Sequence, residues 1–353
     1  ETLKDDYSDK YEYILPEITL DKNLTNNRKF GDLGLQTNLK VHNYDTNKLN
    51  SFFVNDINWR SNNIISKFGF NSNILGNIKS INYDSKNDME FKNEPTSELF
   101  GTLGYLTNLS LRKTNGLNKH FLTPKMLLRY SPGSMRNEIS GSRLDPTSAF
   151  DLSRLNKIDN FETGLTSTLG FDYKIKNNSQ DFNISAAQIF NEKENKKMSS
   201  VSSLDEKNSD LVGAVNATFN KNINLSYNFN LDQNYKDINY SDIGTQMNFG
   251  ALNINFNYLK EQKHIGNNNY FKSKIALRNN DNGLFTFETK RNLITDSSEF
   301  YDLSYEYIND CLRAGLVYRR EFYNDSELEA ENSLLFKITL IPFGDINSPL
   351  INR

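Results

Sequence analysis

The stretch Leu252-Asn-Ile-Asn-Phe-Asn-Tyr258 decides the fold, because apolar and polar residues alternate in it without a break. Successive side chains of a β-strand point to opposite faces, so the four apolar residues share one face. The three asparagines lie on the other face. A helix cannot separate these residues in this way, since its side chains repeat every ~3.6 residues. The stretch therefore predicts a strand with one apolar and one polar face.

The same two-residue period recurs along most of the chain. We predict about seventeen strands, most of them about eight to thirteen residues long, which is longer than strands in ordinary globular sheets. Nothing between them has the spacing of a helix. Clear examples lie at Leu165–Ile175, Leu211–Phe219, Ile223–Leu231, Phe285–Thr289, Tyr301–Tyr307 and Leu334–Leu340.

The connections between these strands alternate between short and long links. The short links are Lys221–Asn222, Gly250–Ala251, Asn279–Gly283 and Asn309–Asp310. The long links are Ser131–Asn160, Asn191–Asp210, Glu261–Asn269, Asn292–Ser298 and Glu321–Asn332. Tight turns at one end of an antiparallel sheet and long loops at the other are typical of an outer-membrane barrel. The sequence therefore predicts an all-β, up-and-down antiparallel transmembrane β-barrel, with loops 131–160 and 191–210 on the extracellular side.

Composition agrees with this fold and excludes other classes. The 353 residues are 37% hydrophobic with a net charge of −3, and no run reaches the ~20 apolar residues of a membrane helix. The near-neutral charge gives no basic surface for nucleic acid. One cysteine excludes an internal disulfide and cysteine-rich zinc modules. A mean hydropathy of −0.67 fits strands whose polar half faces a lumen. The alternative is a large soluble β-sheet, such as an adhesin.

No catalytic, cofactor or metal motif is visible. The three histidines, His42, His120 and His264, are far apart, and no pair has the spacing of metal ligands. The sequence has no glycine-rich phosphate loop that opens a helix and no nucleophile elbow. We therefore expect a protein that is not an enzyme and has no cofactor and no metal site.

Two stretches resemble a known family. The first runs Phe121-Leu-Thr-Pro-Lys-Met-Leu-Leu-Arg-Tyr-Ser-Pro-Gly133 and continues with Arg143-Leu-Asp145 and Phe150-Asp-Leu-Ser-Arg-Leu-Asn156. The second is Tyr301–Tyr323, with an Asn-Asp-Cys turn, followed by Ile341-Pro-Phe-Gly344. Both resemble the LptD family of lipopolysaccharide-assembly proteins, in its alphaproteobacterial form, from about residue 100 to the end.

The resemblance implies a C-terminal portion of a larger barrel. Family members carry an N-terminal periplasmic jellyroll and more strands than this length holds, so we expect a partial barrel, truncated at its N-terminus. Residues 1–341 would form the barrel portion and residues 342–353 a short periplasmic tail.

The resemblance also implies a function in the bacterial outer membrane. The family's translocon inserts lipopolysaccharide into the outer leaflet through a lateral gate between the first and last strands. The implied partners are lipopolysaccharide, an LptE-like plug lipoprotein, an LptA-like periplasmic bridge reached through the missing N-terminal domain, and outer-membrane lipid. By position, one side of the gate is the last strand, with Leu334, Phe336, Ile338, Leu340 and Pro342.

Cys311 matches the position of the family's C-terminal cysteine, which implies an interdomain disulfide with the missing domain. Some members have two adjacent cysteines at this turn, whereas Asp310 takes one of the places here. A free thiol in a turn is the alternative.

The loop Ser131–Asn160 is long enough to suggest a role, so we expect it to fold over or into the barrel mouth. Its charged candidates are Arg143, Asp145 and Arg154. The two arginines are candidates to pair with Asp145 and Asp151 or to face sugar phosphates, and a solvated loop is the alternative. A porin or ligand-uptake receptor barrel is the rival function. It would need rings of like-signed charge, whereas we expect a lumen of mostly Asn, Ser and Thr.

Overall fold

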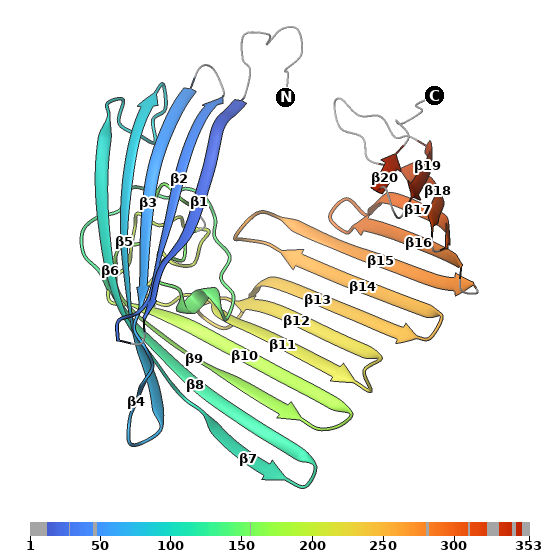
Figure 1. Ribbon diagram of the computed structural model, residues 1–353, viewed down its shortest axis with the longest axis horizontal. Coiled ribbons are helices and arrows are strands. Elements are labelled where there is room, and N and C mark those ends of the chain that lie inside the picture. Colours follow the sequence, from blue (N-terminus) through green and yellow to red (C-terminus); the bar gives the residue numbers. More distant parts are fainter. Residues whose placement is uncertain are drawn as a thin grey trace. The chain divides into compact units, whose positions relative to one another are not determined.

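The computed structural model describes residues 13–27, 29–44, 48–155, 157–279, 282–309, 311–322, 332–340 and 344–347. Within these ranges the chain forms one sheet of twenty strands and a single three-residue 3-10 helix, η2 (Ser148–Phe150). Figure 1 shows the strands in chain order, and each ladder described between them is antiparallel. None of the helical structure in these ranges is long and apolar enough to cross a membrane.

The chain divides into two structural units. The first consists of residues 1–112, 121–172 and 186–212. It holds all or part of β1 (Tyr13–Asn27), β2 (Gly31–Tyr44), β3 (Lys48–Arg60), β4 (Ile64–Ile65), β5 (Phe70–Lys86), β6 (Thr96–Leu109), β8 (Asn118–Ser131), β9 (Gly164–Lys176) and β10 (Gln180–Asn191).

The second unit consists of residues 113–120, 173–185 and 213–353. It holds all or most of β7 (Leu111–Asn115), β11 (Leu211–Phe219), β12 (Ile223–Leu231), β13 (Ile238–Phe249), β14 (Leu252–Glu261), β15 (Asn268–Asn279), β16 (Gly283–Asn292), β17 (Ser297–Ile308), β18 (Leu312–Glu321), β19 (Asn332–Leu340) and β20 (Gly344–Asn347).

The predicted up-and-down antiparallel all-β fold is confirmed. Three of the described strands, β4, β7 and β20, have at most five residues, and the other seventeen have 9 to 17. Residues 344–347, which lie within the predicted tail 342–353, form β20. Residues 342–343 and 348–353 lie outside the described residues. The expected link Glu321–Asn332 and the turn at Asp310 also fall largely outside them.

The two faces of the strands differ as the alternation predicts. On β16 and β17, Phe287 and Leu303 are paired across the ladder and exposed on one face. The next pair, Glu288 and Asp302, lies on the other face. A monomeric soluble protein rarely exposes large apolar patches, whereas a barrel turns such a face to lipid. The exposed apolar face is therefore the lipid-facing surface of a transmembrane sheet, and the soluble alternative is not supported.

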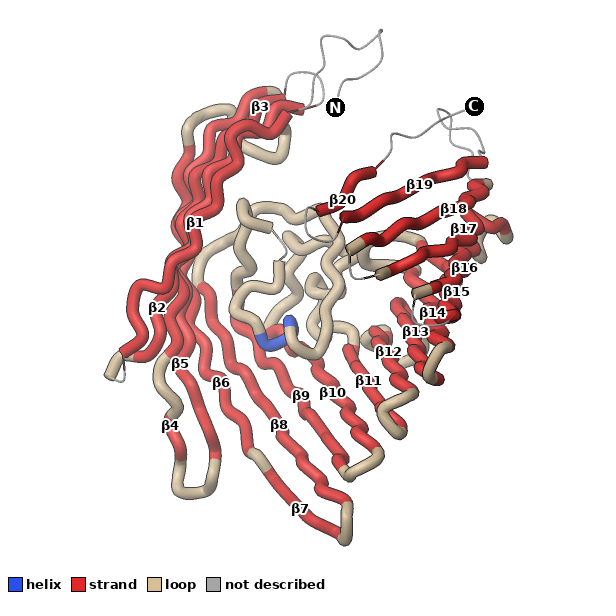
Figure 2. Tube along the Cα trace, turned by 45° about the vertical axis from the view of Figure 1, so that its right-hand side comes forward, coloured by secondary structure: helices blue, strands red, loops and turns tan. Residues whose placement is uncertain are grey.

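In the first unit, the face opposite to lipid is buried beneath two loops, 132–163 and 192–210, which we call the loop cluster. Figure 2 shows these tan loops and the blue η2 gathered beside the strands. Two apolar groups form the contact. One group comprises Phe52, Val54, Ile81, Tyr83, Phe100 and Phe161. The other comprises Met135, Leu144, Ala149, Leu155, Ala187, Ile189, Met198, Leu204 and Val212.

Two strand glycines make room for the loop cluster. A Cβ atom on Gly104 of β6 would lie 2.6 Å from the Leu152 side chain. A Cβ atom on Gly170 of β9 would lie 2.4 Å from the Ala186 carbonyl oxygen and 3.0 Å from the Phe150 ring. Leu152 and Phe150 of the loop cluster therefore pack against strand positions that carry no side chain.

We expect Gly170→Ala to lower the free energy of unfolding by about 1–3 kcal/mol, because the added methyl group overpacks a backbone contact that cannot shift cheaply. The urea midpoint of the folded, heat-modifiable gel band measures this loss. Gly101→Ala is the matched control, since a Cβ atom at Gly101 meets nothing within 4 Å. Equal midpoints for the two variants would contradict the close packing at Gly170.

Candidate functional site

The two loops of the loop cluster hold each other by direct hydrogen bonds. The Glu138 backbone N–H donates to the Lys197 carbonyl oxygen at 2.7 Å. The Lys197 ammonium donates to Ser134 Oγ at 2.6 Å and to the Met135 carbonyl oxygen at 3.0 Å. Two loops separated by two strands in the sequence thus form one packed body, and the solvated-loop alternative is not observed.

A buried ionic group fixes the first loop to the strands. Arg154 Nε donates to Glu162 Oε2 at 2.7 Å, and its Nη2 bonds to the second carboxylate oxygen and to Thr166 Oγ1. Arg129 of β8 is a second cation near the same carboxylate, with Nη1 3.7 Å from Glu162 Oε1. All three charged side chains are buried. One carboxylate thus lies between two guanidinium groups, which offsets part of the cost of burying them.

Arg129 also binds the loop backbone at two separate points. Its Nε donates to the Leu152 carbonyl oxygen at 2.5 Å, and its Nη2 donates to the Glu162 carbonyl oxygen. Lys79 of β5 acts in the same way, since its Nζ lies 3.2 Å from the carbonyl oxygens of both Lys157 and Asn160. Two cations carried by rigid strands therefore hold the loop at four backbone carbonyls.

A second acidic residue links the loop internally. Glu138 Oε1 lies 2.9 Å from Lys157 Nζ, and its Oε2 accepts a hydrogen bond from Asn160. Burial alone would raise the pKa of Glu138, but the hydrogen bonds and charge of Lys157 lower it below the usual value for glutamate. The pKa of Glu162 is also lowered, because the charges of Arg154 and Arg129 outweigh its burial.

The pKa of Asp151 is shifted in the opposite direction. Its burial, together with the nearby charge of Asp145, raises the pKa of the Asp151 carboxyl group. Asp145 itself closes the turn that begins η2, since Oδ1 accepts the backbone N–H groups of Thr147 and Ser148 at 2.6 and 2.9 Å. The acidic groups of the loop cluster therefore differ in role. Asp145 closes a turn, whereas Glu162 forms the buried ion pair with Arg154.

The loop residues predicted from the sequence have different environments. Arg154 is part of the buried ionic group, but its partner is Glu162 and not the aspartates considered from the sequence. Asp145 is an exposed turn residue, and Arg143 is half-buried next to buried Leu144. Sequence reasoning missed Glu162. It also missed Arg129, although a lone charge on the buried face of an apolar strand signals such a site.

The residues of the expected lateral gate from Leu334 to Leu340 lie on β19, which is not the last described strand, because β20 follows it and pairs with it. Leu334 pairs with Tyr318, Phe336 with Leu316 and Ile338 with Ala314 in the ladder with β18. Leu334 and Phe336 are exposed. The ladder of β19 with β18 has nine residue pairs, whereas its ladder with β20 has four, from Lys337 to Leu340. Pro342 and the side chain of Leu340 lie outside the described residues.

Cys311 is exposed, in the turn between β17 and β18. Asn309 Oδ1 accepts hydrogen bonds from the backbone N–H groups of Cys311 and Leu312 at 3.0 and 2.7 Å, which fixes the described part of the turn. The thiol is accessible to a second cysteine. Its neighbour Asp310 lies outside the described residues.

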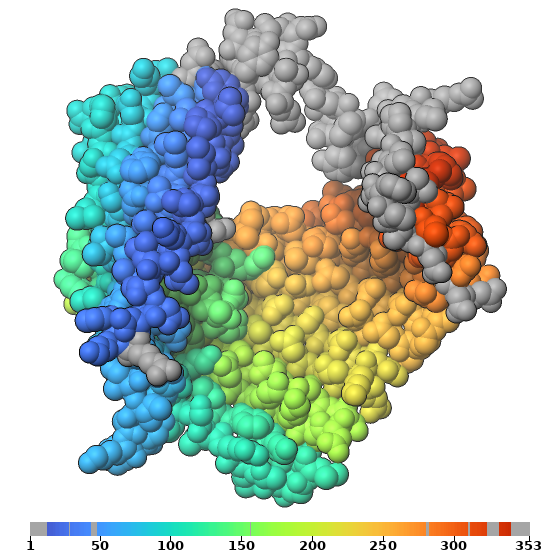
Figure 3. Space-filling model, in the orientation of Figure 1, coloured from blue at the N-terminus to red at the C-terminus, as the bar shows by residue number. Residues whose placement is uncertain are grey.

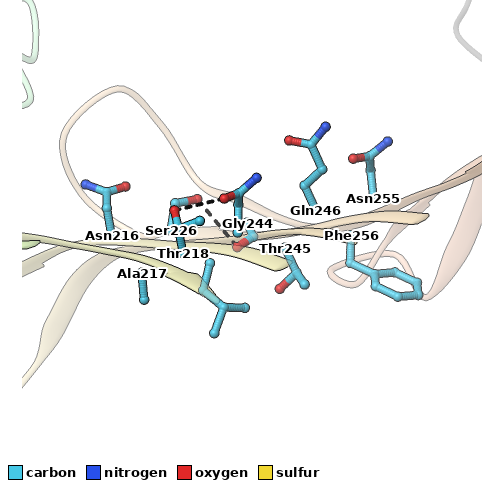
Figure 4. A pocket seen from close by; sticks show the side chains of 11 residues that line it. Asn216, Ala217, Thr218, Ser226, Gly244, Thr245, Gln246, Asn255 and Phe256 are labelled. Carbon is cyan, nitrogen blue, oxygen red and sulfur yellow. Dashed lines mark hydrogen bonds between the residues drawn. The ribbon is translucent and has the colours of Figure 1, made fainter. Parts of the chain in front are cut away.

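The polar face of the second unit has two regions. Across β11–β14 it is mostly uncharged, apart from residues such as Asp242, which accepts hydrogen bonds from Asn257 and Tyr240. A hollow of about 440 Å³ lies beside Gly244. Figure 4 shows Asn216, Ser226, Gln246 and Asn255 pointing to this face and Phe256 to the other. The residues lining the hollow are Asn216, Ala217, Thr218, Asn224, Leu225, Ser226, Gly244, Thr245, Gln246, Asn255 and Phe256.

Across β15–β18 the polar face is charged. This differs from the expected lumen of mostly Asn, Ser and Thr. The charges form pairs of opposite sign: Lys272 and Lys274 with Glu288, Lys290 with Glu299, Arg319 with Asp302, and Arg313 with Glu306. These paired charges do not form the like-signed ring that a charged porin constriction needs. Among the residues that the structure describes, no group of His, Cys, Asp and Glu is arranged to hold a metal ion.

We expect Glu162→Gln to lower the free energy of unfolding by about 3–5 kcal/mol, because it leaves Arg129 and Arg154 buried without a counter-charge. The lowered pKa of Glu162 also sets a pH dependence. Its stabilising effect is complete above the glutamate pKa of the unfolded chain, about 4.3, and is lost as the pH falls through the lower folded value.

Urea midpoints measured across this acidic range test both effects. The Glu299→Gln variant is the control, because its half-exposed pair with Lys290 contributes about 1 kcal/mol or less. A wild-type protein and a Glu162→Gln variant with the same pH profile would rule out the proposed role of the carboxylate.

Comparisons with known proteins identify the family. The family model described as "LptD: LPS transport system D" matches residues 13–293, from the start of β1 to just past β16. No curated protein matches the chain. One similar solved structure is a mutant of the Rh. blastica porin, with 10% sequence identity, coverage of 78% of this chain and 87% of that chain, and a TM-score of 0.29.

The porin likeness is too weak to support an argument. The family match extends farther toward the N-terminus than the resemblance seen in the sequence, and it ends before the Asn-Asp-Cys turn. It covers well over half of the chain and agrees with the observed sheet. The chain therefore belongs to the LptD family.

Proposed function

We propose that this chain is the barrel portion of an outer-membrane translocon that inserts lipopolysaccharide into the outer leaflet through a lateral gate. The observation that carries the proposal is the family match over residues 13–293, to a family described by its role in LPS transport. This is a transport family and not an enzyme family. Family membership and the lipid-facing sheet both point to the outer membrane.

The two faces of the strands suit an amphipathic cargo. Lipopolysaccharide has acyl chains, which belong in the bilayer, and a sugar part that needs a polar route. The amide-rich face of β11–β14 and the paired charges of β15–β18 supply hydrogen-bonding groups without a strong field of one sign. Such a surface supports passage of a sugar chain without holding it tightly.

A lateral gate needs a strand edge that opens at low cost. The β19–β20 ladder, with four residue pairs, is the shortest on β19, and each hydrogen bond in a ladder contributes about 0.5–1.5 kcal/mol net. Leu334 and Phe336 present apolar side chains beside this edge. We propose that β19 forms one side of the gate. Pro342 would end the pairing beyond Leu340, because proline lacks a backbone N–H.

We place the loop cluster on the extracellular side of the barrel and residues 342–353, including the strand β20, at its periplasmic end. The two loops then cover the polar face of the first unit, held by Arg129 and Lys79. Arg143, Asp145 and Arg154 would line or support this cover. The proposed partners are an LptE-like plug lipoprotein and an LptA-like periplasmic bridge, in addition to lipopolysaccharide itself.

A photo-crosslinking experiment tests the gate. We expect a crosslinking amino acid at Leu334 or Phe336 to capture lipopolysaccharide in living cells, because the lipid leaves the barrel beside β19. Phe287 and Leu303 are the matched controls, since they are also exposed to lipid but lie on β16 and β17. Adducts are detected with an antibody against lipopolysaccharide. Equal capture at all four positions would contradict an exit beside β19.

A gel mobility experiment tests the role proposed for Cys311. We expect the full-length protein from outer membranes to migrate differently with and without reductant, because Cys311 bonds to a cysteine outside this chain. Cys311→Ser should abolish the difference. Adding Ser304→Cys to Cys311→Ser should not restore it, because the new thiol lies on β17 and not in the turn. A wild-type protein without a reductant-dependent shift would exclude the interdomain disulfide.

A further inference from the structure

The hairpin that joins β4 to β5 ends in an apolar tip, residues 61–70. Ile64, Ile65, Phe68 and Phe70 are 52%, 75%, 86% and 42% exposed. Figures 1 and 3 show the tip projecting past the turn between β1 and β2. Large side chains displayed so densely mark an interaction surface rather than ordinary scatter.

The tip is a well-defined structure. The Ser66 backbone N–H donates to the Phe70 carbonyl oxygen at 2.8 Å, and the Gly69 N–H donates to the Ser66 carbonyl oxygen at 3.0 Å. Gly69 has φ +86°, which glycine adopts without strain. Asn73 Nδ2 donates to the Ser61 carbonyl oxygen at the base of the hairpin. The apolar side chains are therefore displayed in a fixed arrangement.

The tip continues the lipid-facing surface of the sheet. Ile64 pairs with Ser72, and the two-residue alternation of β5 then puts Ile64 and Phe70 on the same face as exposed Ile74 and Ile78. Ile65 pairs with Asn71 and lies on the opposite face. The tip is thus apolar on both sides and extends the lipid-facing band beyond the regular sheet.

The single charge within residues 61–70 is the cation Lys67. Between Asp56 and Asp84 the sequence has no acidic residue, and Lys67 lies in the turn itself. Arg60, at the base of the hairpin, lies opposite Asp32 in the β2–β3 ladder. Aromatic side chains beside a lysine are typical of the boundary between acyl chains and headgroups, where the lysine reaches the phosphates. A cationic, apolar tip is complementary to phospholipid headgroups, which carry phosphate above hydrocarbon.

We propose that the tip inserts into the headgroup layer of a phospholipid bilayer. Ile64, Phe68 and Phe70 reach the acyl boundary, and Lys67 lies at the level of the phosphates. The tip then anchors the end of the β3–β5 hairpin of the first unit to the membrane, in addition to the lipid contacts of the strands themselves. This inference does not depend on which lipid the protein transports.

Tryptophan fluorescence tests the insertion. Trp59 is the chain's single tryptophan, so Trp59→Phe combined with Phe68→Trp places one probe at the tip. The full chain is reconstituted in vesicles of phosphatidylethanolamine and phosphatidylglycerol with brominated acyl chains. We expect blue-shifted emission that brominated lipid quenches strongly and aqueous iodide quenches weakly.

Two further tryptophan probes in the Trp59→Phe background give the reference signals for a position in lipid and for a position in water. Leu103→Trp, on the lipid-facing side of β6, marks a lipid-embedded position. Met89→Trp, in the loop after β5 and 103% exposed, marks a position in water. Heat-modifiable gel mobility of each variant shows that the sheet is folded.

A probe at position 68 that behaves like the Met89→Trp probe would overturn the proposal and leave the tip available for a protein partner. The added substitution Lys67→Glu tests the electrostatic part. We expect it to reduce lipid quenching at position 68 several-fold in vesicles rich in phosphatidylglycerol. Unchanged quenching would show that Lys67 does not contact the phosphates.

Discussion

A strand in lipid must find every hydrogen-bond partner for its backbone within the protein, because the hydrocarbon offers none. The long antiparallel ladders satisfy this requirement, for example in the unbroken register from Phe249↔Leu252 to Tyr240↔Glu261 between β13 and β14. Once the ladders are fixed, the two-residue alternation decides which side chains meet lipid. The exposed apolar face, the polar face and the strand edges all follow from this one constraint.

The same constraint explains why the buried charges lie where they do. A polar face turned away from lipid can carry cations such as Lys79 and Arg129, which could not face hydrocarbon at acceptable cost. These cations bind backbone carbonyls of the loop cluster, and Glu162 balances the two arginines near it. The loops are therefore held by strand side chains of fixed position, and the glycines at positions 104 and 170 provide space for their apolar residues.

The proposed transport function uses the polar face of β11–β18, whereas the proposed membrane anchor uses the apolar tip between β4 and β5. A lipid carrier needs a polar route on one face and firm contact with the bilayer on the other. The amide-rich surface around Gly244 and the charged pairs of β15–β18 serve the first need. The apolar tip around Phe68 serves the second, at a position where the exposed face extends beyond the sheet.

The sequence by itself determined the fold class, the strand pattern and the family resemblance, because alternation and loop length are local properties of the chain. Leu252–Tyr258 shows this directly, since each residue's face follows from its parity. Only the tertiary structure decided that Arg154 pairs with Glu162 rather than with the nearer Asp151, and that Arg129 joins them. Arg154 and Glu162 lie in the same loop, eight residues apart, whereas Arg129 lies on a strand 33 residues before Glu162. The partner of a buried charge depends on how the loop packs, and no local pattern encodes that packing.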